Sequence, residues 1–322
     1  MDLSYIWYNL IFNPMNPNRL ILKGHFLLIV IVLGLSACKT ALIPVCDISK
    51  SQNPPGTVEL APNLFIDKTE ITNENYREFI YWTRQVYGEN AKEVHQIYPD
   101  TTVWDELEGH LEAIASKYLH HPAYGNYPVV GVSYDQAQAY AQWRSDRVMQ
   151  VYLIEGGKIE AYPDESPETA FTIARYFKGE YRNITPDPEV VLYPHYSLPD
   201  AETYRKTVRF ADSLNALNYD KCVEKNCGDY HLTGCGEDGP PENSFLPRPV
   251  LCEACKATLV TQLQDNVREM MAEPGKVFGG SFGRPCFTEA AGKEGTAIAD
   301  GYTGFRNSCT YQPWKNTDAA TR

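Results

Sequence analysis

The sequence predicts a single α+β domain that is rich in loops, with short strands and few helices. The first observation is the segment Pro128–Trp143, where a β-branched run of valines is followed by apolar and small residues at helical spacing. The second is the composition, because 22 glycines, 22 prolines and 22 tyrosines occur without a long periodic helix. The length of 322 residues fits one large domain or two small ones.

Residues 1–37 have the features of an export signal. A basic flank precedes the apolar run Phe26–Leu33, which is too short to span a membrane. The ending Leu35-Ser36-Ala37-Cys38 resembles the lipobox of bacterial lipoproteins. That resemblance implies that Cys38 is the lipid-bearing first residue of the mature protein. An ordinary export signal and a shortened membrane anchor are the alternatives.

Residues 38–56 are expected to form a tether, since Pro44, Pro54, Pro55 and Gly56 break regular structure there. The residues after Cys38 contain no acidic run. By resemblance to the surface-export signals of Bacteroidota lipoproteins, this favours an outer-membrane protein that faces the periplasm. The formal charge is −12, and residues 1–37 carry a net +1 from Asp2, Arg19 and Lys23, so the mature chain carries −13. Nucleic-acid binding requires a basic face, so this charge argues against it.

The domain is predicted to cover residues 57–315 and to open with two strands and a helix. Residues typical of the strands are Val58, Leu60, Leu64 and Ile66. Thr72 is placed to cap the helix, whose expected inner face is Tyr76, Phe79, Ile80 and Thr83.

The segment Pro128–Trp143 predicts a buried strand at 129–132 that leads into a helix over 135–148. Ser133 stands at the N-cap position with Gln136 three residues later, which is the spacing of a capping box. The core is predicted to include Ile66, Tyr76, Phe79, Val130, Val132, Tyr140, Trp143, Phe282 and Phe305.

Five segments resemble, in the same order, those of the formylglycine-generating-enzyme (sulfatase-modifying-factor) family. They are 65–79, 128–143, 265–270, 277–282 and 304–306. The resemblance implies a C-type-lectin-related α+β domain. The run Trp143-Arg144-Ser145-Asp146-Arg147-Val148 further resembles the gliding-motility and type IX secretion lipoproteins of Bacteroidota. Within the family, Glu70 and Asn73 are expected to be scaffold residues.

Two insertions depart from the family pattern, at about 148–196 and 219–256. The first is rich in tyrosines, which form either a partner surface or part of the packed domain: Tyr152, Tyr162, Tyr176, Tyr181, Tyr193 and Tyr196. The second contains Cys222, Cys227, Cys235, Cys252 and Cys255. Disulfides, a structural zinc held by Cys222, Cys227, Cys252 and Cys255, and a redox pair all remain open for these cysteines.

The oxidising enzymes of the family use two cysteines, five residues apart, to bind copper(I), a soft ion that favours thiolates. Here Cys286 stands at the first position and Ala291 at the second, so we assign no catalytic residue. Asn266 and Glu269 fall where some relatives bind a structural calcium. We assign no other cofactor.

The sequence therefore favours a non-catalytic, lipid-anchored structural or interaction module, whose partners are other envelope proteins of a secretion or motility complex. The alternative is a metal-dependent oxidoreductase of the same family with an altered active site. Nine cysteines less Cys38 leave an even number. Cys286 and Cys309 are the predicted disulfide, and Cys46 is expected to pair with the cluster at 222–255.

Overall fold

The structure, a computed structural model, describes residues 53–105, 112–216, 246–250, 260–282, 293–294 and 299–315. Its helices are α2 (Asn73–Tyr87), α3 (Lys92–Ile97), α4 (Glu112–Tyr118), α5 (Tyr134–Glu155), α6 (Ile173–Phe177) and α7 (Ala201–Ala216), with the 3-10 turns η2 (Thr101–Trp104) and η3 (Pro122–Tyr124). Its strands are β1 (Thr57–Ala61), β2 (Leu64–Asp67), β3 (Leu192–Ser197), β4 (Arg268–Met270), β5 (Lys276–Phe278), β6 (Lys293–Glu294), β7 (Thr303–Gly304) and β8 (Ser308–Pro313).

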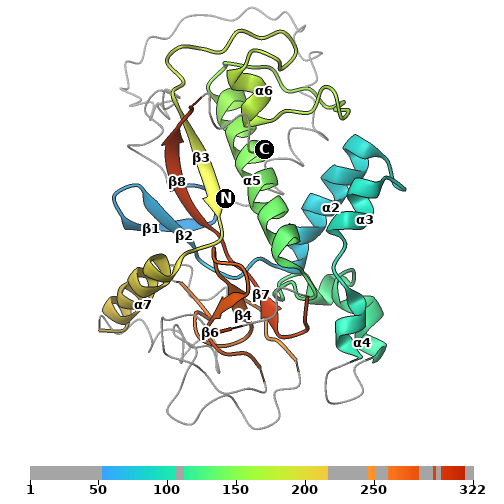
Figure 1. Cartoon of the computed structure of the whole chain (residues 1–322), viewed down its shortest axis with the longest axis vertical. Helices are drawn as coiled ribbons and strands as arrows, with labels where there is room; N and C mark the ends of the chain where they lie inside the picture. The colour runs from blue at the N-terminus through green and yellow to red at the C-terminus, as the bar shows by residue number, and fades with distance from the viewer. Residues whose placement is uncertain are drawn as a thin grey trace, which may run out of the picture.

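The strands form two small sheets, and the first of them lies beside the long helix α5 (Figure 1). The first sheet is antiparallel with the order β1-β2-β8-β3, and α5 lies beside β3. The second has the order β6-β5-β4-β7, and its β4–β7 pair is parallel. Short strands, irregular segments and few long helices agree with the predicted α+β class. No helix in the described part of the chain is both long and apolar enough to cross a membrane.

Both predicted helix starts are confirmed by their capping hydrogen bonds. The backbone N–H of Gln136 donates to the Ser133 hydroxyl at 3.3 Å, and the N–H of Ser133 donates to the Gln136 side chain at 2.8 Å. Thr72 and Asn75 form the same reciprocal pair at the start of α2. Helix α5 continues past the predicted end at residue 148 to Glu155, so the first residues of the first insertion are helical.

All nine predicted core residues are buried. Their centre is a group of aromatic rings that joins α2, α5 and the segment before β8. Tyr76 stacks on Tyr140 with ring centroids 5.7 Å apart, and Phe305 meets Tyr140 edge-on at 5.4 Å. Phe79 contacts Trp143 at 5.3 Å. The apolar faces predicted for the two helices are therefore packed against each other.

The strand predicted at 129–132 is wrong, although its three valines are buried. The backbone of this extended segment bonds to three separate places instead of one neighbouring strand. Val129 N–H donates to Ile71 O at 2.9 Å, Gly131 N–H donates to Asp300 O at 3.0 Å, and Gly131 O accepts from Asp100 N–H at 2.7 Å. Gly131 also has a φ of 74°, which interrupts an extended ladder.

The first insertion packs onto the domain and has a core of its own. Of the six tyrosines noted in the sequence, Tyr176, Tyr181, Tyr193 and Tyr196 are buried, and Tyr152 and Tyr162 are half-buried. Tyr162, Tyr176, Tyr181 and Tyr193 pack with Phe171 and Leu153, while Tyr152 and Tyr196 pack with Phe65 and Tyr311 of the first sheet. Phe177 stacks on Trp314 after β8 with ring centroids 5.2 Å apart. The packed interpretation is thus correct for these tyrosines. Most of the second insertion, including its cysteines, lies outside the described residues.

We predict that Gly131→Ala destabilises the domain by about 3 kcal/mol or more. The positive φ strains an alanine backbone, and the steric clash of its Cβ adds to that cost. A Cβ at Gly131 would lie 2.3 Å from Asp100 O. Gly157→Ala is the matched control, because Gly157 has a similar φ of 65° but nothing within 4 Å of the added Cβ. Urea unfolding of both variants measures the difference. Equal losses of stability would show that the close approach to Asp100 contributes nothing.

Candidate functional site

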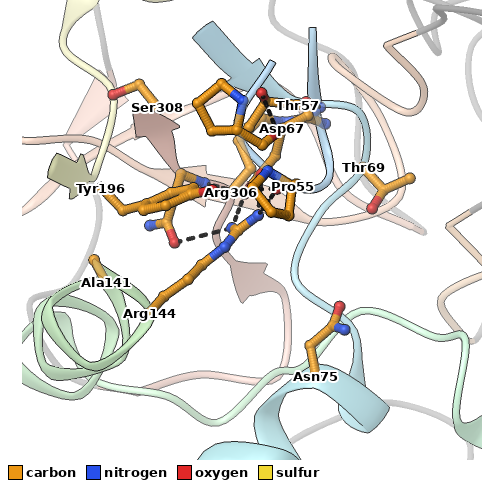
Figure 2. Close-up of polar contacts among 12 residues, drawn as sticks. Pro55, Thr57, Asp67, Thr69, Asn75, Ala141, Arg144, Tyr196, Arg306 and Ser308 are labelled. Carbon is orange, nitrogen blue, oxygen red and sulfur yellow. Dashed lines mark hydrogen bonds and ion pairs between the residues drawn. The ribbon is translucent and has the colours of Figure 1, made fainter. Parts of the chain in front are cut away.

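One turn of α5, Arg144 to Arg147, carries four consecutive polar side chains, and all four are buried. Arg144 forms an ion pair with Asp67 at the end of β2, through Nη1–Oδ2 at 2.7 Å and Nη2–Oδ1 at 2.8 Å (Figure 2). Its guanidinium also lies over the ring of Tyr196, 4.2 Å from the centroid. Arg144 therefore joins α5 to β2 and β3.

Arg147 makes an equivalent connection to the first insertion. Its Nη1 donates to Glu165 at 3.0 Å and to Gln150 at 2.7 Å. Glu165 also accepts from Gln150 at 2.9 Å and from the indole N–H of Trp82 at 3.0 Å. The Arg147 guanidinium lies 4.4 Å from the Trp82 ring centroid. A single carboxylate of the insertion is thereby bound by α2 and α5 together.

The two residues between the arginines bind backbone groups. The Ser145 hydroxyl accepts from Tyr196 N–H of β3 at 2.9 Å. Asp146 accepts from Ile173 N–H at 2.9 Å, at the first residue of α6. The turn from Arg144 to Arg147 consequently holds β3 and α6 as well as β2 and residue 165.

A second buried ion pair ties the C-terminal part of the chain to the second sheet. Arg306 donates to both oxygens of Glu269 in β4, at 2.6 Å from Nε and 2.5 Å from Nη2. Tyr204 of α7 donates to the same carboxylate at 2.8 Å. Arg306 also donates to Asp67 O at 3.1 Å, so it links both sheets.

Glu70 lies beside this pair and is fully buried. Its Oε1 accepts from Asn266 Nδ2 at 3.0 Å, and its Oε2 has no hydrogen-bond partner among the described residues. Burial raises the pKa of Glu70 well above its ordinary value; Arg306 lowers this pKa, and the nearby charge of Glu269 raises it. Burial also raises the pKa of Glu269, but this carboxyl accepts two hydrogen bonds from Arg306, which lower its pKa again.

The scaffold interpretation of Glu70 and Asn73 agrees with these contacts. Asn73 is buried and donates to Tyr118 O and Tyr124 O, each at 3.0 Å. Asn73 holds the start of α2 against the end of α4 and the turn that follows, while Glu70 joins the segment before α2 to Asn266.

The residues predicted for calcium do not fit an ion. The Oδ1 of Asn266 accepts from Arg248 N–H at 2.7 Å, and its Nδ2 donates to Glu70. Both oxygens of Glu269 accept from Arg306. Within the described ranges, no group of three or more His, Cys, Asp or Glu side chains is arranged to hold a metal. These side chains form internal polar contacts that support the fold.

The cysteines predicted to carry chemistry or crosslinks fall mostly outside the described residues: Cys38, Cys46, Cys222, Cys227, Cys235, Cys252, Cys255 and Cys286. The zinc and cluster predictions are therefore untested. Among the described residues, Cys309 in β8 is buried with a free thiol, and burial raises its pKa. Because Cys286 is not described, the Cys286–Cys309 pairing stays a prediction.

The residues at 286 and 291 can be compared with the two thiolates that the copper(I) site of the oxidising enzymes requires. The segment that precedes them, Gly280–Phe282, is buried, and its N–H groups pair with the chain at Gln264 and Asn266, at 2.8 Å each. The sequence then offers one thiol, Cys286, and Ala291 in place of the second. One thiol and a methyl group do not form the paired thiolate set.

Sequence reasoning missed the roles of Arg144, Asp146, Arg147 and Glu165. A signal for them existed, because four polar residues in a row stand between Trp143 and Val148 in a helix. Successive helical residues are about 100° apart, so four of them cannot share one solvent face. At least part of the run had to be buried and paired.

Comparison with known families matches residues 27–313 to the sulfatase-modifying factor enzyme 1-like domain. The chain therefore belongs to the sulfatase-modifying factor family. The match spans both sheets, the α5 turn and both insertions. The comparison with curated proteins found no match to the chain.

We predict that Glu165→Ala destabilises the domain by about 3–5 kcal/mol, because it leaves Arg147 buried without its counter-ion. Glu168→Ala is the control within the same insertion, since Glu168 is exposed, and its expected effect is within about 0.5 kcal/mol. Chemical denaturation of both variants provides the measurement. If Glu165→Ala were as mild as the control, the insertion would not depend on this ion pair.

Glu70 makes the free energy of unfolding of the domain depend on pH, and its raised pKa sets the direction of that dependence. An unfolded glutamate titrates near pH 4.3, while the folded pKa is raised, so stability falls as pH rises from about 4.3 through the folded pKa. Glu70→Gln should remove this loss and make the domain more stable than wild type at pH 8.

Unfolding free energies from pH 5 to pH 8 test this for wild type, Glu70→Gln and Glu74→Gln, an exposed glutamate one turn away. The Glu74 variant should keep the wild-type slope. A Glu70→Gln protein with an unchanged slope would show that Glu70 is ionised in the folded state.

Proposed function

We propose that this chain is a non-catalytic lipoprotein of the outer membrane that serves as a structural or interaction module in gliding-motility or type IX secretion machinery. Its partners are other envelope proteins, and its membrane attachment is the lipid on Cys38. The proposal includes the C-type-lectin-related fold expected of the family and a domain that faces the periplasm.

The observation that supports the proposal is that the chain keeps the residues that hold the family fold together but has only one of the two cysteines that oxidation requires. The family match, the buried Arg306–Glu269 pair and the packed Gly280–Phe282 segment all belong to the scaffold. The donor set that oxidising relatives require is reduced to Cys286, with Ala291 beside it. A family member with this scaffold and this replacement is suited to binding rather than to oxidation.

Two sequence features support the envelope location and the branch. The Leu35–Cys38 ending resembles a lipobox. The resemblance to gliding-motility and secretion lipoproteins rests on the run from Trp143 to Val148, whose two arginines anchor β2 and the first insertion. The insertion is thus a built part of the domain and offers its outer face to partners.

Cys38→Ala should release the protein from the membrane fraction of a Gram-negative host. Cys46→Ala, in the same predicted tether, is the control and should stay with the membrane. Mass spectrometry of the wild-type N-terminal peptide should find the acyl groups on Cys38. Unchanged fractionation of Cys38→Ala, together with an unmodified Cys38 in wild type, would contradict the proposed anchor.

A further inference from the structure

The last residues of the predicted tether are part of the folded domain. Pro54 is buried, and its carbonyl accepts from the N–H of Thr57 at 3.1 Å and from the Thr57 hydroxyl at 2.7 Å. The carbonyl of Gly56 accepts from Lys68 N–H at 3.0 Å. The chain is therefore fixed before β1 begins, three residues earlier than the sequence suggested.

Arg144 is the centre of this attachment (Figure 2). Its Nη2 donates to Pro55 O at 2.8 Å while both Nη groups bind Asp67. The hydroxyl of Tyr196 donates to the same Pro55 carbonyl at 3.3 Å. Thus α5 and β3 both contact one peptide group of the incoming chain, and the ion pair to β2 holds the guanidinium in place.

The close approach is matched by a glycine. Gly56 has a φ of 80°, and a Cβ there would lie 3.0 Å from Arg144 Nη2. A larger residue would press on the guanidinium and would be strained in this conformation. We call Pro54–Gly56, Asp67, Arg144 and Tyr196 the clamp.

The position of the clamp matters because β1 is an edge strand. Among the described strands, in the order β1-β2-β8-β3, it pairs with β2 alone, and its pairing is irregular between Glu59 and Ala61. Without the clamp, a pull on the chain ahead of β1 would act first on the pairing of β1 with β2, which is short and irregular. The clamp holds the chain at Pro54–Gly56, just before β1. A force applied to the N-terminal segment therefore acts on the clamp first, which transmits it to α5 and β2.

We propose that the clamp is a force-bearing joint, which fixes the N-terminal segment to the body of the domain and protects the β1 edge from being pulled away. Its use at a membrane rests on the proposed function, in which that segment carries the lipid anchor. The joint itself is a property of the folded chain. The mechanical test does not depend on the outcome of the Cys38→Ala experiment, because it pulls on the folded chain directly.

The test is to hold the mature chain by handles at its two ends and stretch it in optical tweezers. Wild type should show only smooth stretching of the predicted tether, with no discrete release of β1, before the main unfolding event. Arg144→Lys keeps the charge but loses the bidentate contact to Asp67, so it should release residues 54–61, which include β1, early and at a clearly lower force. That release corresponds to about 8 residues, or at most about 26 Å of extended chain.

Arg205→Lys is the control, because Arg205 forms a half-exposed pair with Glu202 on α7; it should behave as wild type. Tyr196→Phe and Thr57→Val each remove one hydroxyl of the clamp region while preserving shape, and should lower the release force by a smaller amount. These two variants decide the question if Arg144→Lys does not fold. An early release in wild type, or force curves of the folded clamp variants identical to wild type, would overturn the proposal.

Discussion

The burial of four consecutive polar residues in α5 is the constraint on which the surrounding segments depend. Successive side chains of a helix point about 100° apart, so the turn from Arg144 to Arg147 reaches in several directions at once. Each buried polar group must find a partner, since leaving one unpaired costs of the order of 1–3 kcal/mol and more for a charge. β2, β3, the insertion at residue 165 and the start of α6 supply those partners. One helical turn thereby sets the positions of segments that are far apart in the sequence.

The second ion pair extends this arrangement across the two sheets. Arg306 binds Glu269 in β4 and the backbone of Asp67, whose carboxylate is bound by Arg144. Buried pairs of this kind give modest net stability, but removal of one partner is costly, so they fix which segments meet. The family scaffold is therefore maintained by residues distinct from the cysteine pair used in oxidation. That separation explains how the fold can persist in a chain that has Ala291 at the second cysteine position.

Local signals were read correctly from the sequence, whereas long-range contacts were not. The capping boxes at Thr72 and Ser133 and the buried faces of α2 and α5 depend on residues within a few positions of each other. The segment 129–132 was predicted as a strand because its valines favour one, but its hydrogen bonds go to Ile71, Asp100 and Asp300. The Arg147–Glu165 and Arg144–Pro55 contacts also depend on the fold, which residue types alone do not specify.

We propose that this member of the sulfatase-modifying factor family retains the family scaffold without the copper chemistry. The most direct measurement is a copper(I) competition titration of the purified mature chain under reducing conditions, compared with Cys286→Ala and Cys309→Ala. We expect no stoichiometric copper(I) binding that depends on Cys286. One equivalent of tightly bound copper(I) in wild type, lost in Cys286→Ala and kept in Cys309→Ala, would contradict it.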